Sequence, residues 1–165
     1  MVFTIESIDK LSVNTSEREQ TLQSVAKIED VVQSQDAWGY QAIAELLAQD
    51  SVDLLVVYQI DKVVGYCLHH VIFEQAEILR IGTHPDYQRQ GVASQIFATL
   101  NEELMNNQVE SLLLEVRADN FAAIALYEQQ GFVTIHRRKG YYQVPHQLAI
   151  DALIMQRLFK GHDIL

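Results

Sequence analysis

Cysteine, proline and long apolar runs are scarce in this chain of 165 residues. Cys67 is the only cysteine, so an internal disulfide is excluded, and the six histidines show no metal-ligand spacing with it or with one another. No apolar run approaches the ~18–20 residues of a membrane-spanning helix, and residues 1–6 lack the basic and apolar blocks of a secretory signal. We therefore expect a cytoplasmic protein that holds no metal and does not bind a membrane.

Basic residues are also outnumbered, with 12 Lys and Arg against 22 Asp and Glu and a net charge of −10. This balance argues against nucleic acid as the main partner, because a phosphate backbone favours a basic surface. Residues 1–60 carry ten acidic and three basic residues, whereas residues 61–165 carry twelve and nine. The acidic excess permits a basic protein or peptide as partner, and it equally serves ordinary solubility.

The composition is that of a globular protein, with 48% hydrophobic and 21% charged residues. No repeat, low-complexity tract or linker interrupts it, which predicts a single domain over residues 1–165. Apolar alternation predicts strands over residues 2–6, 52–60, 63–73, 76–83, 111–117, 132–138 and 149–159. Helical spacing predicts helices over 21–35, from 42, from 92 and over 121–130, and residues 140–145 are expected to form a loop. Cys67 falls within a strand pattern and is expected to be a small buried residue.

The most informative stretch is residues 76–105, where a strand turns into a helix. Gly91 and Ala93 lie at the start of that helix, whose apolar face begins at Val92. The first backbone N–H groups of a helix have no partner within it, and the helix dipole places partial positive charge there. Because Gly91 lets the backbone approach a ligand, this junction is suited to bind phosphate. A glycine at this place can also simply form a turn without binding a ligand.

Three motifs carry a resemblance to a known family. They are Gln88-x-x-Gly91-x-Ala93, then Leu114-Glu115-Val116-Arg117-Ala118-x-Asn120, and then Ala123-Ile124-Ala125-Leu126-Tyr127-Glu128 followed by Gly131-Phe132. Together they resemble the Gcn5-related N-acetyltransferase (GNAT) superfamily, and within it the bacterial ribosomal-protein-alanine N-acetyltransferases of the RimI type. The resemblance covers residues 76–142, with a weaker echo at 151–155.

The resemblance implies an α/β (α+β) fold with a mixed sheet of about seven strands and about four helices. It also implies a splay between strands 76–83 and 111–117, where acetyl-CoA enters as the acetyl donor. The backbone of Ile81, Gly82 and Thr83 would hold the pantetheine arm. The diphosphate would be held by Arg89, Gln90, Gly91, Val92, Ala93 and Ser94. The Asn120 side chain would contact the cofactor or cap its helix, and both roles are compatible.

The same resemblance assigns the general base to Glu115 and the general acid to Tyr127. Glu115 alternates with Leu114 and Val116 and so faces the other side of its strand. An apolar setting can raise the pKa of a carboxyl toward working pH, which suits proton abstraction from an ammonium. The alternative for Glu115 is a structural ion pair with an arginine. The alternative for Tyr127 is a core tyrosine with a satisfied hydroxyl.

The acceptor side is less well defined. Trp38, Tyr40 and Tyr142 occupy regions where family members contact substrate, but the usual Phe-Pro-Trp-Ser segment is absent and Gln143 replaces a common proline. Trp38 can equally have a structural role and pack the first helices together. We expect acetylation of an N-terminal α-amine, with alanine of a ribosomal protein as the favoured acceptor. A lysine or a small-molecule amine is an alternative acceptor, and a CoA-binding module without turnover is a further alternative.

Overall fold

The computed structural model describes residues 1–8, 15–33 and 36–159. Its strands are β1 (Thr4–Ser7), β2 (Val52–Gln59), β3 (Lys62–Ile72), β4 (Gln75–Thr83), β5 (Ser111–Arg117), β6 (Val133–Tyr142) and β7 (Ile150–Leu158). Its helices are α1 (Thr15–Val32), α2 (Tyr40–Leu47), α3 (Val92–Asn106), α4 (Phe121–Gln129) and the short 3-10 helix η1 (Pro85–Tyr87). Within these described ranges, none of the helices combines the length and the apolar character that crossing a membrane requires.

The strands form one mixed sheet in the order β1-β2-β3-β4-β5-β7-β6. The pairs β1–β2, β2–β3, β5–β7 and β6–β7 are antiparallel, and β4–β5 is parallel. The parallel pairing joins residues 75–77 to 111–113, at the beginning of both strands. The sheet and the four α-helices confirm the predicted fold class.

The chain divides into two compact units, each of which is described by itself. The first unit contains residues 1–70 and 79–103, and the second contains residues 71–78 and 104–165. Both β3 and β4 therefore contribute to each unit, as does α3. The single domain expected over residues 1–165 stays a prediction.

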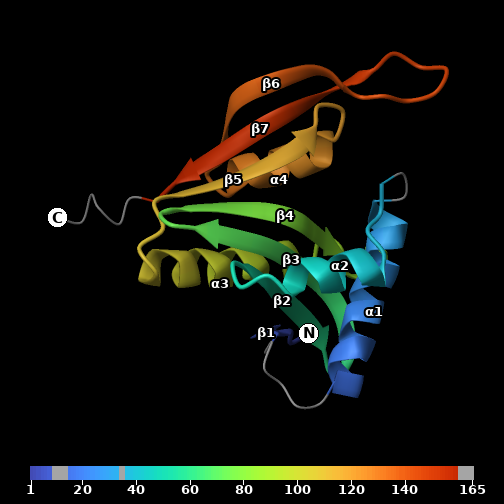
Figure 1. Cartoon of the computed structure of the whole chain (residues 1–165), viewed down its shortest axis with the longest axis vertical. Coiled ribbons are helices and arrows are strands. Elements are labelled where there is room, and N and C mark those ends of the chain that lie inside the picture. Colours follow the sequence, from blue (N-terminus) through green and yellow to red (C-terminus); the bar gives the residue numbers. More distant parts are fainter. Residues whose placement is uncertain (9–14, 34–35, 160–165) are drawn as a thin grey trace. The chain divides into compact units, whose positions relative to one another are not determined.

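In the first unit, α1 and α2 lie together beside β2 and β3 (Figure 1). Leu22, Val25 and Ile28 are spaced three residues apart, so one face of α1 is apolar and becomes buried. They form a core cluster with Ile43 and Leu47 of α2 and with the apolar residues of β2 and β3. This packing fixes α1 and the segment that connects it to α2.

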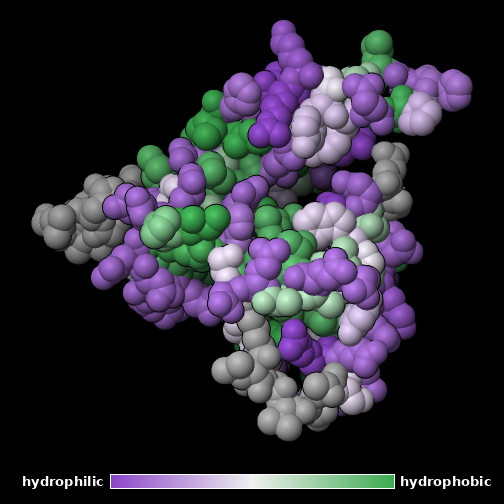
Figure 2. Space-filling model, viewed as in Figure 1, coloured by the Kyte–Doolittle hydropathy of each residue, from purple (hydrophilic) through white to green (hydrophobic). Residues whose placement is uncertain are grey.

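In the second unit, the alternation along β5 separates two faces. Leu112, Leu114 and Val116 are buried, whereas Glu115 and Arg117 are half-buried on the other face. Strand β7 pairs with the whole length of β5, and β6 forms the edge of the sheet. Hydrophilic residues predominate on the visible surface of β6 (Figure 2), and most of this strand is exposed.

Two predicted boundaries were wrong. Helix α1 begins at Thr15 instead of residue 21, because the polar residues before Leu22 occupy the exposed side of the same helix. The predicted end at Gln35 lies outside the described residues. Strand β6 continues through Tyr142, where a loop was expected. A register shift between Arg138 and Tyr142 and the positive φ of Gly140 (62°) accommodate the irregularity, and Tyr142 pairs with Ile150.

Close packing between β3 and α3 gives a stability prediction. A Cβ atom at Gly65 would lie 2.6 Å from Val92 Cγ1, and the short branched valine side chain has little freedom to move away. Gly65→Ala should therefore lower the free energy of unfolding by about 1–3 kcal/mol in urea denaturation. Gly39→Ser is the control, because no atom lies within 4 Å of a Cβ there and serine suits the N-cap of α2, so it should not lower stability by more than about 0.5 kcal/mol. Equal stability of the two variants would contradict this packing.

Candidate functional site

The first unit holds the predicted phosphate-binding junction. Strand β4 ends at Thr83, η1 follows, and α3 begins at Val92. Gly91 has φ of 87°, a left-handed conformation that glycine adopts without strain, and no atom lies within 4 Å of where its Cβ would be. The Gln95 N–H donates to Gly91 O at 3.0 Å, so the helical hydrogen bonding starts at this residue. The backbone amides of the first turn thus begin beside an uncovered glycine, as a phosphate site requires.

Side chains within the connection hold this junction in place. Gln88 Nε2 donates to Thr83 O at 3.3 Å, and Gln90 Nε2 donates to Asp86 O at 3.1 Å. The His84 Nδ1 atom accepts a hydrogen bond from the Asp86 N–H at 3.1 Å. Arg89 also has a positive φ, 60°, and its side chain is exposed.

The end of β4 contains the three residues predicted to hold the pantetheine arm. Ile81, Gly82 and Thr83 are half-buried. A Cβ at Gly82 would lie 2.6 Å from the hydroxyl oxygen of Tyr66, so the ring of Tyr66 occupies the place of a side chain. The backbone here is therefore restricted to glycine on one side, as expected for a strand that binds a ligand through its amides and carbonyls.

In the second unit, Glu115 has features of both of its predicted interpretations. Its Oε1 lies 3.6 Å from Arg138 Nη1, which is an ion-pair distance but too long for a hydrogen bond. The same Oε1 atom is buried and has no hydrogen-bond partner. Burial raises the pKa of the Glu115 carboxyl, the Arg138 guanidinium lowers it, and the Glu77 carboxylate raises it. Desolvation has the largest effect, so the pKa lies above its ordinary value, as a general base near neutral pH needs.

Two further predicted residues of this unit belong to helix α4 and its N-terminal cap. The Asn120 Oδ1 atom accepts a hydrogen bond from the Ala123 N–H at 3.2 Å, which confirms the helix cap and does not test the cofactor contact. Tyr127 is buried, with its ring 6.0 Å from that of Phe132. Its backbone carbonyl accepts from the Phe132 N–H at 3.0 Å, so the turn after α4 folds back onto it.

Two arginines of the second unit lie against the tyrosine pair. The Arg138 guanidinium lies 5.2 Å from the centroid of the Tyr141 ring, and that of Arg117 lies 5.5 Å from the centroid of Tyr142. Arg117 also forms an ion pair with Asp119 at 3.1 Å. The sequence had suggested an arginine partner for Glu115 without identifying Arg138. Its position depends on how β6 pairs across β7, and periodicity alone does not give that register.

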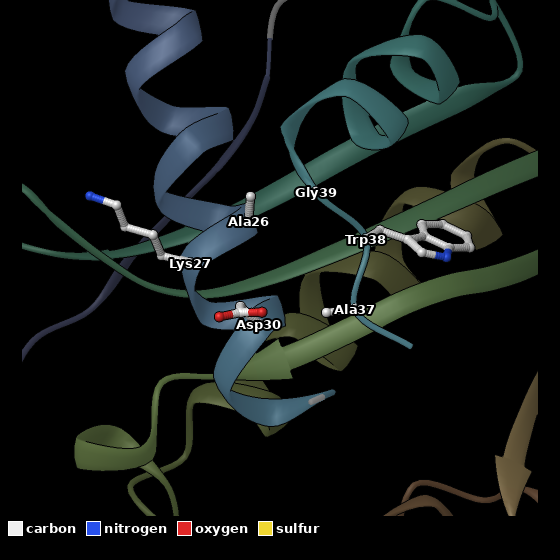
Figure 3. Close-up of a pocket in the computed structure, with 6 residues that line it drawn as sticks. All are labelled: Ala26, Lys27, Asp30, Ala37, Trp38 and Gly39. Carbon is white, nitrogen blue, oxygen red and sulfur yellow. The ribbon is translucent and has the colours of Figure 1, made fainter. Parts of the chain in front are cut away.

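The acceptor-side residues Trp38 and Tyr40 lie in the first unit. Trp38 donates its backbone N–H to Glu29 Oε2 at 2.9 Å, and its ring lies 4.1 Å from the Arg80 guanidinium. Tyr40 begins α2 and is half-buried. A pocket of about 310 Å³ adjoins this segment and is lined by Ala26, Lys27, Asp30, Ala37, Trp38 and Gly39. In Figure 3 the indole of Trp38 points away from Asp30 and Lys27.

The structure thus brings the predicted residues together in two sets. The first unit contains Trp38, Tyr40, the β4 backbone and the α3 junction, and the second contains Glu115, Asn120, Tyr127 and Tyr142. Among the residues that the structure describes, no group of three His, Cys, Asp or Glu side chains is placed to hold a metal ion.

Comparisons with known proteins agree with the resemblance. The model of the acetyltransferase (GNAT) family matches residues 17–132. The [ribosomal protein bS18]-alanine N-acetyltransferase of Escherichia coli (strain K12) is 40% identical over 94 residues, which are 57% of this chain and 63% of that protein. The chain thus spans less than two thirds of the length of this curated relative.

Solved structures match over more of the chain. The crystal structure of the ribosomal-protein-S18-alanine N-acetyltransferase from Escherichia coli has a TM-score of 0.82 and 30% identity, over 95% of this chain and 94% of that one. A ribosomal-protein-alanine N-acetyltransferase from Brucella melitensis has a TM-score of 0.76 over 94% of this chain and 99% of that one, at 22% identity, which shows a shared fold alone. Since the family model covers more than half of its length, the chain belongs to the acetyltransferase (GNAT) family.

Proposed function

We propose that this protein transfers an acetyl group from acetyl-CoA to the N-terminal α-amine of a protein. The observation that carries the proposal is the junction before α3, where Gly91 has a left-handed φ and open space beside it within the motif Gln88-x-x-Gly91-x-Ala93. The family membership of the chain supports the same reaction. Alanine of a ribosomal protein is the favoured acceptor, because the relatives that match this chain are named for that activity.

The residues of the first unit fit the donor. Amides from Gly91 to Ser94 would bind the diphosphate, and the positive end of the α3 dipole would favour its charge. Gly82 has no side chain of its own, and the Tyr66 ring packs against it on one side. The amide and carbonyl groups of the β4 backbone would pair with the amide groups of the pantetheine arm. Acetyl-CoA supplies the activated thioester, and these backbone groups bind and orient it.

Glu115 would take the proton from the acceptor ammonium. Its carboxyl has a raised pKa because of burial, so it is a stronger base than an exposed glutamate. An α-ammonium, with a pKa of about 7.7–8.0, releases its proton far more readily than a lysine at about 10.4. The modest basicity of a carboxylate therefore favours an α-amine as acceptor.

Tyr127 would donate a proton to the departing thiolate. Its phenol is a donor of suitable acidity, with an ordinary pKa of about 10. Direct attack of the amine on the thioester forms the C–N bond and releases CoA as a thiol, and no covalent enzyme intermediate is needed. Cys67 is fully buried and burial raises the pKa of its thiol, so this residue is unsuited to carry an acyl group.

The acceptor can be tested directly by measuring CoA release. We expect turnover with a peptide that begins with alanine and a basic segment, because the chain has a net charge of −10. The same peptide with a blocked α-amine and a free lysine should be at least about tenfold poorer, since its amine is harder to deprotonate. Turnover of the blocked peptide alone would make the acceptor a lysine. Cofactor binding without turnover of any amine would make the protein a CoA-binding module.

The pH dependence tests Glu115 as the base. Activity falls at low pH as the base becomes protonated, so Arg138→Gln, which removes a cation that lowers the pKa of Glu115, should move the acid limb of kcat/KM to higher pH. Arg137→Gln is the matched control, because Arg137 pairs with Asp151 at 2.7 Å. Glu115→Gln should remove this limb and lower kcat by about 10²–10⁴. A limb that stays in place in all three variants would exclude Glu115 as the base.

The two roles of Asn120 can be separated by two substitutions. Asn120→Ala removes the cap and should lower the free energy of unfolding by about 1 kcal/mol. Asn120→Asp retains an oxygen that accepts from the Ala123 N–H, so stability should be nearly unchanged. If Asn120 also contacts the cofactor, both variants should raise the KM for acetyl-CoA. A normal KM in both would leave Asn120 with a capping role only.

A further inference from the structure

We propose that Glu29 and Arg80 are positioning residues for the acceptor, which hold Trp38 in a fixed arrangement, and that Tyr66 joins the same carboxylate to the end of β4. This inference rests on the proposed function, since it concerns the acceptor side of that reaction. All four side chains belong to the first unit, and they come from α1, β3, β4 and the segment that precedes α2.

The centre of the arrangement is the carboxylate of Glu29, which is completely buried. Its Oε1 accepts a hydrogen bond from the Tyr66 hydroxyl at 2.5 Å, and its Oε2 accepts from the Trp38 N–H at 2.9 Å. Arg80 Nε lies 3.4 Å from the same Oε2. A buried carboxylate is strongly unfavourable unless charged and hydrogen-bonding groups surround it, so these three contacts depend on one another.

Arg80 links this carboxylate to the segment before α2. Its Nη2 donates to the backbone oxygen of Asp36 at 2.7 Å, and its Nη1 lies 3.5 Å from Asp36 Oδ2. Its guanidinium also lies 4.1 Å from the centroid of the Trp38 ring. The planar guanidinium thus binds backbone, carboxylate and aromatic face together, which a lysine cannot do.

Tyr66 connects the arrangement to the strand proposed to bind the donor. Its hydroxyl is the closest atom to the place of a Cβ on Gly82, at 2.6 Å. Burial and the nearby Glu29 carboxylate raise the pKa of the Tyr66 phenol, so it stays protonated and continues to donate. One buried carboxylate therefore fixes both the backbone of the Trp38 segment and the ring that packs on Gly82.

The consequence is that the orientation of Trp38 is set by Arg80. If the indole contacts the acceptor, loss of Arg80 weakens acceptor binding and leaves the α3 junction, which binds the donor, unchanged. A purely structural role would instead lower stability and affect both substrates alike. A positioning role therefore changes the ratio of the acceptor KM to the acetyl-CoA KM, whereas a purely structural role leaves this ratio unchanged.

Trp38 provides a readout that does not require activity, because it is the only tryptophan of the chain. Arg80→Gln should shift its fluorescence emission to longer wavelength and increase its quenching by acrylamide, since the guanidinium no longer covers the ring. The control is Arg18→Gln, which removes a half-buried arginine on α1 and should leave emission unchanged. Tyr66→Phe, which removes one hydroxyl and keeps the ring, should change emission in the same direction as Arg80→Gln. Unchanged emission in both would overturn the proposal.

Kinetics then test the link to the acceptor. With an Ala-initiated peptide, Arg80→Gln should raise the acceptor KM about tenfold and leave the KM for acetyl-CoA within about twofold. In a Trp38→Ala background, the Arg80→Gln substitution should change the acceptor KM little further, because both substitutions remove the same interaction between Arg80 and Trp38. Additive effects, or equal changes in both KM values, would overturn the positioning role. Absence of turnover by the unsubstituted protein would reject the proposed function, and the fluorescence result would still decide whether Arg80 positions Trp38.

Discussion

The proposed chemistry depends on two glycines, one at the end of β4 and one before the start of α3, where the backbone carries no side chain. Side chains are excluded there for two different reasons. At Gly82 the ring of Tyr66 fills the place of a Cβ, and at Gly91 the φ of 87° disfavours any other residue. We propose that the backbone amides and carbonyls here recognise the repeated polar groups of the cofactor, so that few charged side chains are needed. This explains why an acidic protein can belong to a family of acetyl-CoA-dependent enzymes.

The second unit contains a carboxyl group, that of Glu115, whose pKa is set by two opposing effects. Desolvation raises the pKa of Glu115, and Arg138 limits that increase from 3.6 Å away. A carboxyl with a very high pKa would stay protonated at neutral pH, and one with an ordinary pKa would be a poor base. The ion pair and the proposed base thus involve the same carboxyl group, because the arginine limits how far the pKa of Glu115 rises.

The acceptor side shows a similar combination of roles. Trp38 is held by Glu29 through its backbone and by Arg80 through its ring, so it staples the connection between α1 and α2. A fixed indole loses little conformational freedom when a ligand binds, which is also the property of a good recognition residue. The sequence offered these two interpretations as alternatives, and the contacts make them compatible.

The strand and helix pattern, the motif proposed to bind phosphate and the residue types proposed for acid–base chemistry can all be predicted from the sequence. These features are local, because apolar periodicity and a glycine before a helix are visible over a few residues. The partner of Glu115, Arg138, and the meeting of Glu29, Tyr66 and Arg80 become visible only in the folded chain. Those pairings join residues far apart in the chain through strand register and helix packing, and a one-residue slip in register would reverse the face of every side chain. The extension of β6 to Tyr142 was missed for the same reason, since its pairing with Ile150 follows a register shift that no local pattern signals.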